Sequence, residues 1–411
     1  MQKLFEYGVL LFVFSLPIIE STKNIGFFIM LAGFIGLVFY EKSIKIQKPD
    51  MIEYLLLFLL LIYVLSTLLN WPLLKGVKGL KHEIYYLFTF WMLYKSEFNK
   101  QFLKMLSIAL VSGTIIGLFW GEYNVLYKGV TELKLNSINS ISRSGSYITS
   151  ILFICVGVLI DRSCNFKRNI KVFFLVSLMI ISASMFLMGG RGNVISMILT
   201  YSILLFFLFN YKKYIQLVVA QFCIALIIII VLNYSSNSSY VGRFHHLKSL
   251  NFSSDISEMT KNDQIRYDYW RIGVAQVQQY PALFGIGPGN YKAINSEKLN
   301  FEKPLLKVGQ PHHAHNWIIT KFVEDGIVGA SVFLIFIILI AYRLIKNRVV
   351  NGNAGLNWIW VASVSSIFTA SISGLFNSAF THENGMLTIV LMAIGTSYFI
   401  NNKIPDITNV D

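Results

Sequence analysis

The feature that most constrains this chain is a series of long apolar runs, each about as long as an α-helix that crosses a bilayer. Such a crossing takes about 20 predominantly apolar residues. The runs lie near residues 4–20, 24–40, 51–69, 77–94, 102–120, 144–160, 172–189, 193–209, 214–233, 316–345, 357–379 and 384–400. The first and fourth runs are the weakest, and Gly326 and Gly329 interrupt the tenth. The sequence therefore predicts an all-α polytopic membrane protein with about twelve transmembrane helices.

Composition supports this fold class. Of the 411 residues, 55% are hydrophobic and only 14% are charged, whereas a soluble domain carries about a quarter charged residues. Much of the surface must therefore face lipid. The three cysteines show neither a disulfide framework nor metal-ligand spacing. No clear small-residue cleavage site follows the first apolar run, so we expect it to be a retained helix.

The gaps between the apolar runs are basic on alternate sides, which predicts the orientation. Cytoplasmic loops of membrane proteins carry an excess of Lys and Arg. On one side the gaps hold Lys42, Lys45, Lys48, Lys95, Lys100, Lys104, Arg162, Lys167, Arg168, Lys171, Lys212, Lys213, Arg343, Lys346 and Arg348. Both termini then lie in the cytoplasm. This bias explains most of the net charge of +14, although attraction to an anionic lipid is a second explanation.

The same orientation divides the chain into three parts. Residues 1–233 carry helices one to nine, 234–314 form a large loop outside the cytoplasm, and 315–411 carry the last three helices and a cytoplasmic tail. The loop is too long for a simple turn. Within it, residues 262–280 read as an amphipathic helix that Pro281 ends.

Several cations lie on the outer side, against the charge bias. Lys75, Lys78 and Lys81 can extend toward the lipid headgroups. Arg143 stands at the outer end of the run at 144–160, and Arg191 occupies the tight turn 189–192 between two glycines. An arginine at the membrane boundary is costly to desolvate unless an anion pairs with it. We therefore favour a functional role for Arg191 over a structural one, since its flanking glycines let a ligand approach.

The outer loop holds two further candidate features. Residues 266–271 read Arg-Tyr-Asp-Tyr-Trp-Arg, and Gly285, Gly287 and Gly289 follow in a tight turn before Asn290 and Tyr291. Backbone N–H groups of such a turn can hold a phosphate, but a plain loop fits equally well. The turn lacks the strand-then-helix context of a nucleotide-binding fold, which excludes a Rossmann or P-loop site.

Three histidines, His312, His313 and His315, stand where the loop re-enters the membrane. Their spacing does not match a zinc site, because no HExxH pattern or cysteine pair accompanies them. A single working imidazole is the better interpretation, since histidine titrates near neutral pH and can act as a base. The alternative is a histidine that only caps the following helix.

These motifs together resemble a known family. His315-Asn316, nine residues, Gly326, two residues and Gly329 resemble the signature of the bacterial O-antigen ligases. Arg266-x-x-x-Trp270, Pro281 and the Gly285–Tyr291 turn resemble the O-antigen ligase/polymerase superfamily, and the Gly-Arg-Gly turn at 190–192 resembles its Ser-Arg-Gly turn. Gly190 stands where that family has serine.

The resemblance implies a membrane-embedded glycosyltransferase of the GT-C type, acting at the periplasmic face of the bacterial inner membrane. Its donor is a polysaccharide on undecaprenyl diphosphate, and its acceptor is lipid A–core. It implies inversion at the anomeric carbon and no metal or other cofactor. The family's functional residues fall on His315, Arg191 and Arg266. We expect contributions to substrate binding from Arg143, Arg271, Gly287, Gly289, Asn316 and His313.

Two other functions remain open. A polymerase of the same superfamily would use a second lipid-linked glycan as acceptor and share every motif, although the spacing after His315 and the single large loop favour a ligase. A lipid or sugar transporter is a different class, but the sequence shows neither an internal repeat nor many ionisable residues in the runs. We expect membrane lipids and no nucleic acid as partners; the sequence does not define an oligomeric state.

Overall fold

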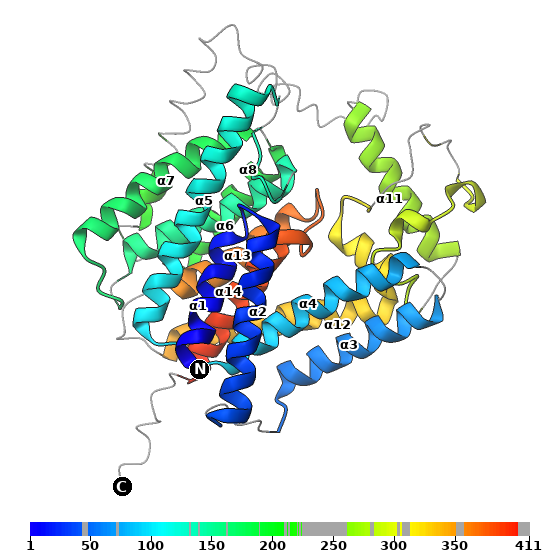
Figure 1. Ribbon diagram of the computed structural model, residues 1–411. Coiled ribbons are helices and arrows are strands. Elements are labelled where there is room, and N and C mark those ends of the chain that lie inside the picture. The colour runs from blue at the N-terminus through cyan, green and yellow to red at the C-terminus, as the bar shows by residue number, and fades with distance from the viewer. Residues whose placement is uncertain are drawn as a thin grey trace, which may run out of the picture.

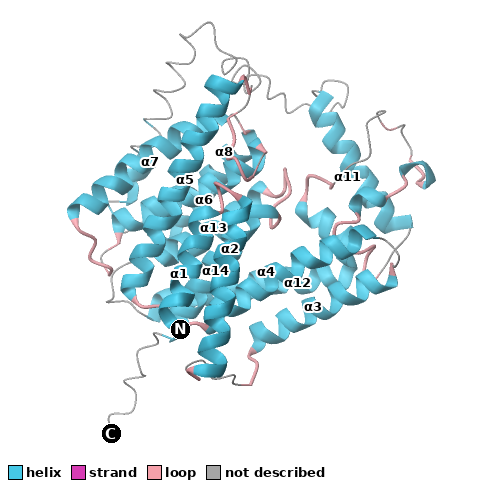
Figure 2. Cartoon of the chain, in the orientation of Figure 1, coloured by secondary structure: helices cyan, strands magenta, loops and turns pink. Residues whose placement is uncertain are grey.

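The computed structural model describes residues 1–42, 48–70, 74–130, 133–138, 140–161, 163–188, 190–208, 261–279, 283–301, 313–350 and 357–401, with a few single positions and short pieces between them. Within these residues the chain is built from helices and loops (Figure 2). The first half comprises α1 (Gln2–Ser15), α2 (Glu20–Ile35), a π-helical turn (Gly36–Tyr40), α3 (Met51–Leu69), α4 (Leu74–Lys95), α5 (Lys100–Lys128), α6 (Ile141–Ile160), α7 (Arg168–Met188) and α8 (Arg191–Leu208).

The second half begins with α11 (Lys261–Gln279) and two short 3₁₀ turns (Tyr291–Ala293 and Ser296–Lys298). Three long helices follow: α12 (Trp317–Val350), α13 (Trp358–Ser373) and α14 (His382–Asn401). The helix expected over residues 262–280 is confirmed by α11.

Several helices begin where the sequence supplies a capping side chain. Asp50 and Glu53 form a capping box at the start of α3, because each side chain accepts a hydrogen bond from the other's backbone N–H. Asn357 caps α13 by accepting from the N–H of Ile359 at 3.0 Å. Such caps satisfy N–H groups that have no partner inside the helix.

The helices α6, α13 and α14 lie at the centre of the bundle. α6 packs against α13 and α7, α13 against α14 and α8, and α14 against α4. Figure 1 shows α1 and α2 side by side on one flank of this core, while α3, α4 and α12 form a second group that α11 adjoins.

Seven described helices are long and apolar enough to cross a membrane, which indicates a multi-pass membrane protein. They cover Glu20–Tyr40, Met51–Leu69, Lys100–Lys128, Ile141–Ile160, Arg168–Met185, Trp317–Asn347 and His382–Ile400. Two shorter apolar helices cover Gly192–Leu208 and Trp358–Ser373. The runs at 4–20 and 77–94 correspond to α1 and α4, which are not among the seven, and most of the run at 214–233 lies outside the described residues. Twelve spans therefore stay a prediction.

The helix α12 is broken, as its glycines suggested, but only one of them breaks it. Gly326 has φ 71° and ψ −177°, a conformation that is essentially confined to glycine. Gly329 stays helical and faces α3, where a Cβ on it would come within 3.0 Å of Ile62 Cγ2.

A buried cluster of charged side chains lies beside the break, and the sequence did not predict it. The ammonium group of Lys321 lies 2.8 Å from Glu83 Oε1 and 2.9 Å from Asp325 Oδ2. It also donates to the hydroxyl of Tyr63 at 3.3 Å. These contacts join α12 to α4 and α3. A buried charge is stable only when it is paired in this way, so the cluster fixes the first segment of α12 against its neighbours.

Candidate functional site

The local backbone presents His315 at the entrance to α12. Asn316 caps this helix, because its side-chain oxygen accepts from the N–H groups of Ile318 at 3.0 Å and Ile319 at 3.2 Å. His315 itself has φ 53°, and its N–H donates to Nδ1 of His313 at 3.1 Å. Asn316 and His313 thus shape the turn that carries His315. Their expected contacts with substrate stay predictions.

The imidazole of His315 packs against two rings. It stacks on Tyr269 of α11 with a centroid separation of 5.8 Å and an interplanar angle of 14°. The ring of His313 lies 4.2 Å away on a tilted plane. Tyr269 is held in turn through its carbonyl, which accepts from the Tyr291 hydroxyl at 2.6 Å.

Two arginines act electrostatically on His315. Burial, the charge of Arg266 and the charge of Arg143 together lower the pKa of His315 to about 4. Arg266 comes from α11 and Arg143 from the start of α6, so three helices converge here. A cation next to an imidazole opposes its protonation. The neutral form, which is the one able to accept a proton, therefore dominates at neutral pH.

Arg271 lies one turn further along α11 than Arg266 and already has partners. Its Nη1 is 2.9 Å from Asp268 Oδ1, and its guanidinium stands 5.4 Å from the ring centroid of Phe301. Arg271 is thus fixed against α11 and the loop that follows. The charge of Arg266, and not that of Arg271, is among the causes that lower the pKa of His315, so Arg266 is the α11 arginine that acts on this imidazole.

Arg191 is the first residue of α8, but its side chain and Gly189 lie outside the described structure. The start of α8 packs against α6. Ser146 of α6 donates to the Asn193 side-chain oxygen at 3.0 Å, and a Cβ on Gly145 would overlap the Asn193 amide. The backbone of Arg191 therefore begins its helix beside the helix that carries Arg143.

The glycine-rich turn after α11 has a different role from the expected one. It docks into the break of α12, where Ile286 N–H donates to Val323 O at 3.0 Å and Gly287 N–H donates to Glu324 O at 2.9 Å. Tyr291 N–H donates to the Glu324 carboxylate at 3.1 Å. The amide of Gly287 already has an acceptor within the protein, so the geometry does not support a phosphate cradle there.

The glycines of this turn allow two backbones to touch. A Cβ on Gly285 would lie 2.4 Å from Gly326 N, and a Cβ on Gly326 would lie 2.3 Å from Leu283 O. Glu324 accepts hydrogen bonds from the amides of the turn inside this contact. The glycine-rich turn and the break in α12 are therefore two halves of one joint.

Sequence reasoning missed one element of the site, the turn between α13 and α14 (residues 374–381, the α13–α14 turn). Trp317 N–H donates to Gly374 O at 2.9 Å, and a Cβ on Gly192 would lie 3.2 Å from Phe376 Cβ. Arg143 is also close enough for its charge to act on His382, which opens α14. In the sequence of this turn, Gly374 indicates the end of a helix but does not indicate a functional site, because glycines are common at helix ends.

The starts of α6, α8, α12 and α14 therefore lie together around Arg143. The N-terminal end of a helix carries partial positive charge from its unpaired N–H groups. Several such ends with arginines among them favour a phosphate or diphosphate group. The arrangement can hold an anionic group and offer it a neutral base.

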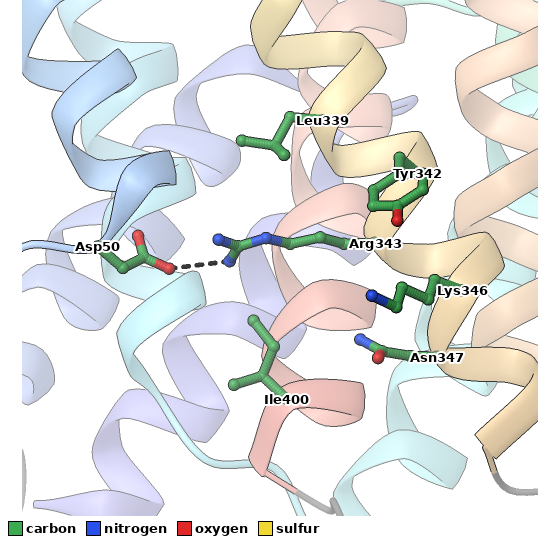
Figure 3. Close-up of a pocket in the computed structure, with 7 residues that line it drawn as sticks. All are labelled: Asp50, Leu339, Tyr342, Arg343, Lys346, Asn347 and Ile400. Atoms are coloured by element: carbon green, nitrogen blue, oxygen red, sulfur yellow. Dashed lines mark hydrogen bonds and ion pairs between the residues drawn. The ribbon is translucent and has the colours of Figure 1, made fainter.

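Among the described residues, no group of three or more His, Cys, Asp or Glu side chains could hold a metal ion; His312 lies outside them. A cavity of about 330 Å³ lies at the other end of α12, lined by Asp50, Leu339, Tyr342, Arg343, Lys346, Asn347 and Ile400 (Figure 3). There Arg343 is paired with Asp50 at 2.8 Å, which ties α12 to the start of α3.

The fold and the site define a polytopic α-helical membrane protein with a histidine and arginines gathered at one end of its bundle. Residues 174–334 match the family model of the O-antigen ligases, which supports the resemblance of this segment to the O-antigen ligase/polymerase superfamily. Members of this family are glycosyltransferase-like enzymes. The match contains Arg191, Arg266 and His315, whereas Arg143 and the α13–α14 turn lie outside it. The comparison with curated proteins gave no match.

Proposed function

We propose that this protein is an O-antigen ligase, which transfers a polysaccharide from undecaprenyl diphosphate to lipid A–core at the periplasmic face of the inner membrane. The proposal is supported above all by the surroundings of His315, which stacks on Tyr269 at the start of α12 and whose pKa is lowered by burial and by the charges of Arg266 and Arg143. The family match over the same segment supports the reaction class.

In the proposed reaction, His315 takes the proton from the acceptor hydroxyl as its oxygen attacks the anomeric carbon of the donor. The bond from that carbon to the diphosphate oxygen breaks, and the lipid diphosphate leaves with its electrons. Attack from the face opposite the leaving group inverts the anomeric carbon. Negative charge then grows on the diphosphate, where fixed guanidinium groups stabilise it. Arg191 and Arg266 form this clamp, and Arg143 supports it.

The activity is tested by supplying the purified protein in detergent with a lipid-diphosphate-linked glycan and lipid A–core. A ligase forms glycosylated lipid A–core and releases lipid diphosphate. Elongation of the donor glycan, with no product on lipid A–core, would instead identify a polymerase.

The same assay tests whether the reaction needs a metal. We expect transfer to continue in EDTA, because the described site offers guanidinium groups and no metal-ligand cluster to the diphosphate. Loss of transfer in EDTA that a divalent cation restores would contradict the proposed chemistry.

A further inference from the structure

The α13–α14 turn and the end of α13 that leads into it touch the three helix starts that carry the proposed functional residues. Its first contact is with α12. Trp317 stands two residues after His315, and both its N–H groups donate to this region: the backbone group to Gly374 O at 2.9 Å and the indole group to Ser371 O at 3.1 Å. Its ring also packs edge-on against Phe380 at 5.2 Å.

The other contacts reach α6 and α8. Ser373, the last residue of α13, lies 2.9 Å from the hydroxyl of Ser146, three residues after Arg143. Phe376 covers Gly192, the residue after Arg191. The turn and the end of α13 therefore contact residues that lie one to three positions after His315, Arg143 and Arg191.

The turn is also closely packed and held in an unusual conformation. A Cβ on Gly374 would lie 2.5 Å from Trp317 Cδ1 and 2.3 Å from Ala379 Cβ. Phe380 has φ 55°, which a bulky residue adopts only where its surroundings fix it. Small changes in this turn must consequently move the helix starts that it contacts.

We propose that the α13–α14 turn sets the position of His315 relative to Arg143 and Arg191, with Trp317 and Gly374 as positioning residues. The role rests on the proposed function, since it concerns how base and arginines face one substrate. The rate of such a reaction depends steeply on the positions of the catalytic groups, because a displacement of about 1 Å can lower it on the order of a hundredfold.

The test compares two tryptophans that make the same bond across the same pair of helices. Trp317 of α12 donates its indole N–H to Ser371 of α13, whereas Trp360 of α13 donates its indole N–H to Leu344 O of α12 at 2.9 Å, near the other end of the pair. Both side chains are buried. Trp317→Phe and Trp360→Phe each remove one such bond and keep an aromatic ring.

We expect Trp317→Phe to lower kcat roughly ten- to a hundredfold per folded molecule, with a smaller change in KM. The acidic limb of its pH–rate profile should move to higher pH. The reason is that the charge of Arg143 would then act less strongly on His315, so the pKa of the imidazole would rise. Trp360→Phe should lose comparable thermal stability and keep normal turnover and the normal pH limb. Equal effects of the two variants on kcat, or no effect of Trp317→Phe, would overturn the positioning role.

A double variant shows whether the effect passes through His315. If it does, Trp317→Phe adds little to His315→Ala, because the positioned base is already gone. If His315→Ala is strongly impaired and Trp317→Phe lowers its residual turnover by the same factor as in the wild type, the positioning role is overturned and the proposed function stands. Normal turnover in His315→Ala would overturn both.

Discussion

The proposed reaction depends on the charge state of a single residue, His315. Neutral imidazole accepts a proton, and the protonated form cannot. Because burial, Arg266 and Arg143 hold the pKa of His315 near 4, the base stays neutral from neutral pH well into the acidic range. An ordinary histidine would lose this form near pH 6.5.

Removing one of these arginines should move the acidic limb of the pH–rate profile. In Arg266→Gln the cation beside His315 is lost, so the pKa of the imidazole should rise from about 4 toward its ordinary value. Transfer should then decline at a higher pH than in the wild type, in addition to an overall loss of rate. Profiles of kcat against pH for both proteins measure the shift.

Arg168→Gln serves as the matched control, because Arg168 is an exposed arginine at the start of α7. Its acidic limb should coincide with that of the wild type. An unchanged limb in Arg266→Gln would show that Arg266 does not act on the base.

Among the structural elements, the joint between α12 and the glycine-rich turn supports the surroundings of His315, because it holds Tyr291, which bonds Tyr269. The sequence predicted the break at Gly326 and the helix α11, since glycine inside an apolar run and an amphipathic pattern before proline are local signals. It did not predict that the two motifs meet. Gly285 and Gly326 are far apart in the chain, and only the folded structure shows that each glycine makes room for the other's backbone.

Because of this joint, we expect two glycine substitutions to lower the free energy of unfolding by unequal amounts. Gly326→Ala adds a Cβ that would lie 2.3 Å from Leu283 O, in a backbone conformation confined to glycine. Gly129 also has a positive φ, of 66°, but a Cβ there would meet nothing within 4 Å. Gly129→Ala should therefore cost only about 1 kcal/mol for its left-handed conformation, and Gly326→Ala considerably more.

Thermal unfolding in detergent, with turnover of the folded fraction, measures both effects. Gly326→Ala should lower the unfolding midpoint further than Gly129→Ala and reduce transfer, because the joint holds Tyr291 and, through it, Tyr269 against His315. Equal losses of stability in the two variants would contradict the role of the joint.

The site itself was only partly visible in the sequence. Arg266 and His315 stand in motifs of one loop, and the structure brings them together with Arg143, which is more than 100 residues distant. The α13–α14 turn carries no motif, and its role depends on packing between helices that a single sequence does not reveal. In the glycine-rich turn, the sequence left a phosphate site and a plain loop both open, and the structure shows that Glu324 accepts hydrogen bonds from the N–H groups of Gly287 and Tyr291.

At the scale of the whole molecule, the proposed function requires the site to face away from the cytoplasm. The alternating Lys and Arg bias predicts that residue 297 lies outside and residue 48 inside. Both side chains are exposed. In a background lacking Cys155, Cys164 and Cys223, Glu297→Cys should react with a membrane-impermeant thiol reagent in spheroplasts. Lys48→Cys should react only after the membrane is permeabilised, and the reverse pattern would invert the topology.

The most direct test of the account is the turnover of His315→Ala in glycan transfer from a lipid diphosphate, counted per folded molecule. The variant should fold, insert and bind the donor, yet lose transfer by roughly 10²–10⁴-fold, which is what a positioned base contributes. His313→Ala should lose much less, since His313 only accepts the backbone N–H of His315. Normal turnover in His315→Ala, with reduced stability or with an inactive His313→Ala, would contradict the account.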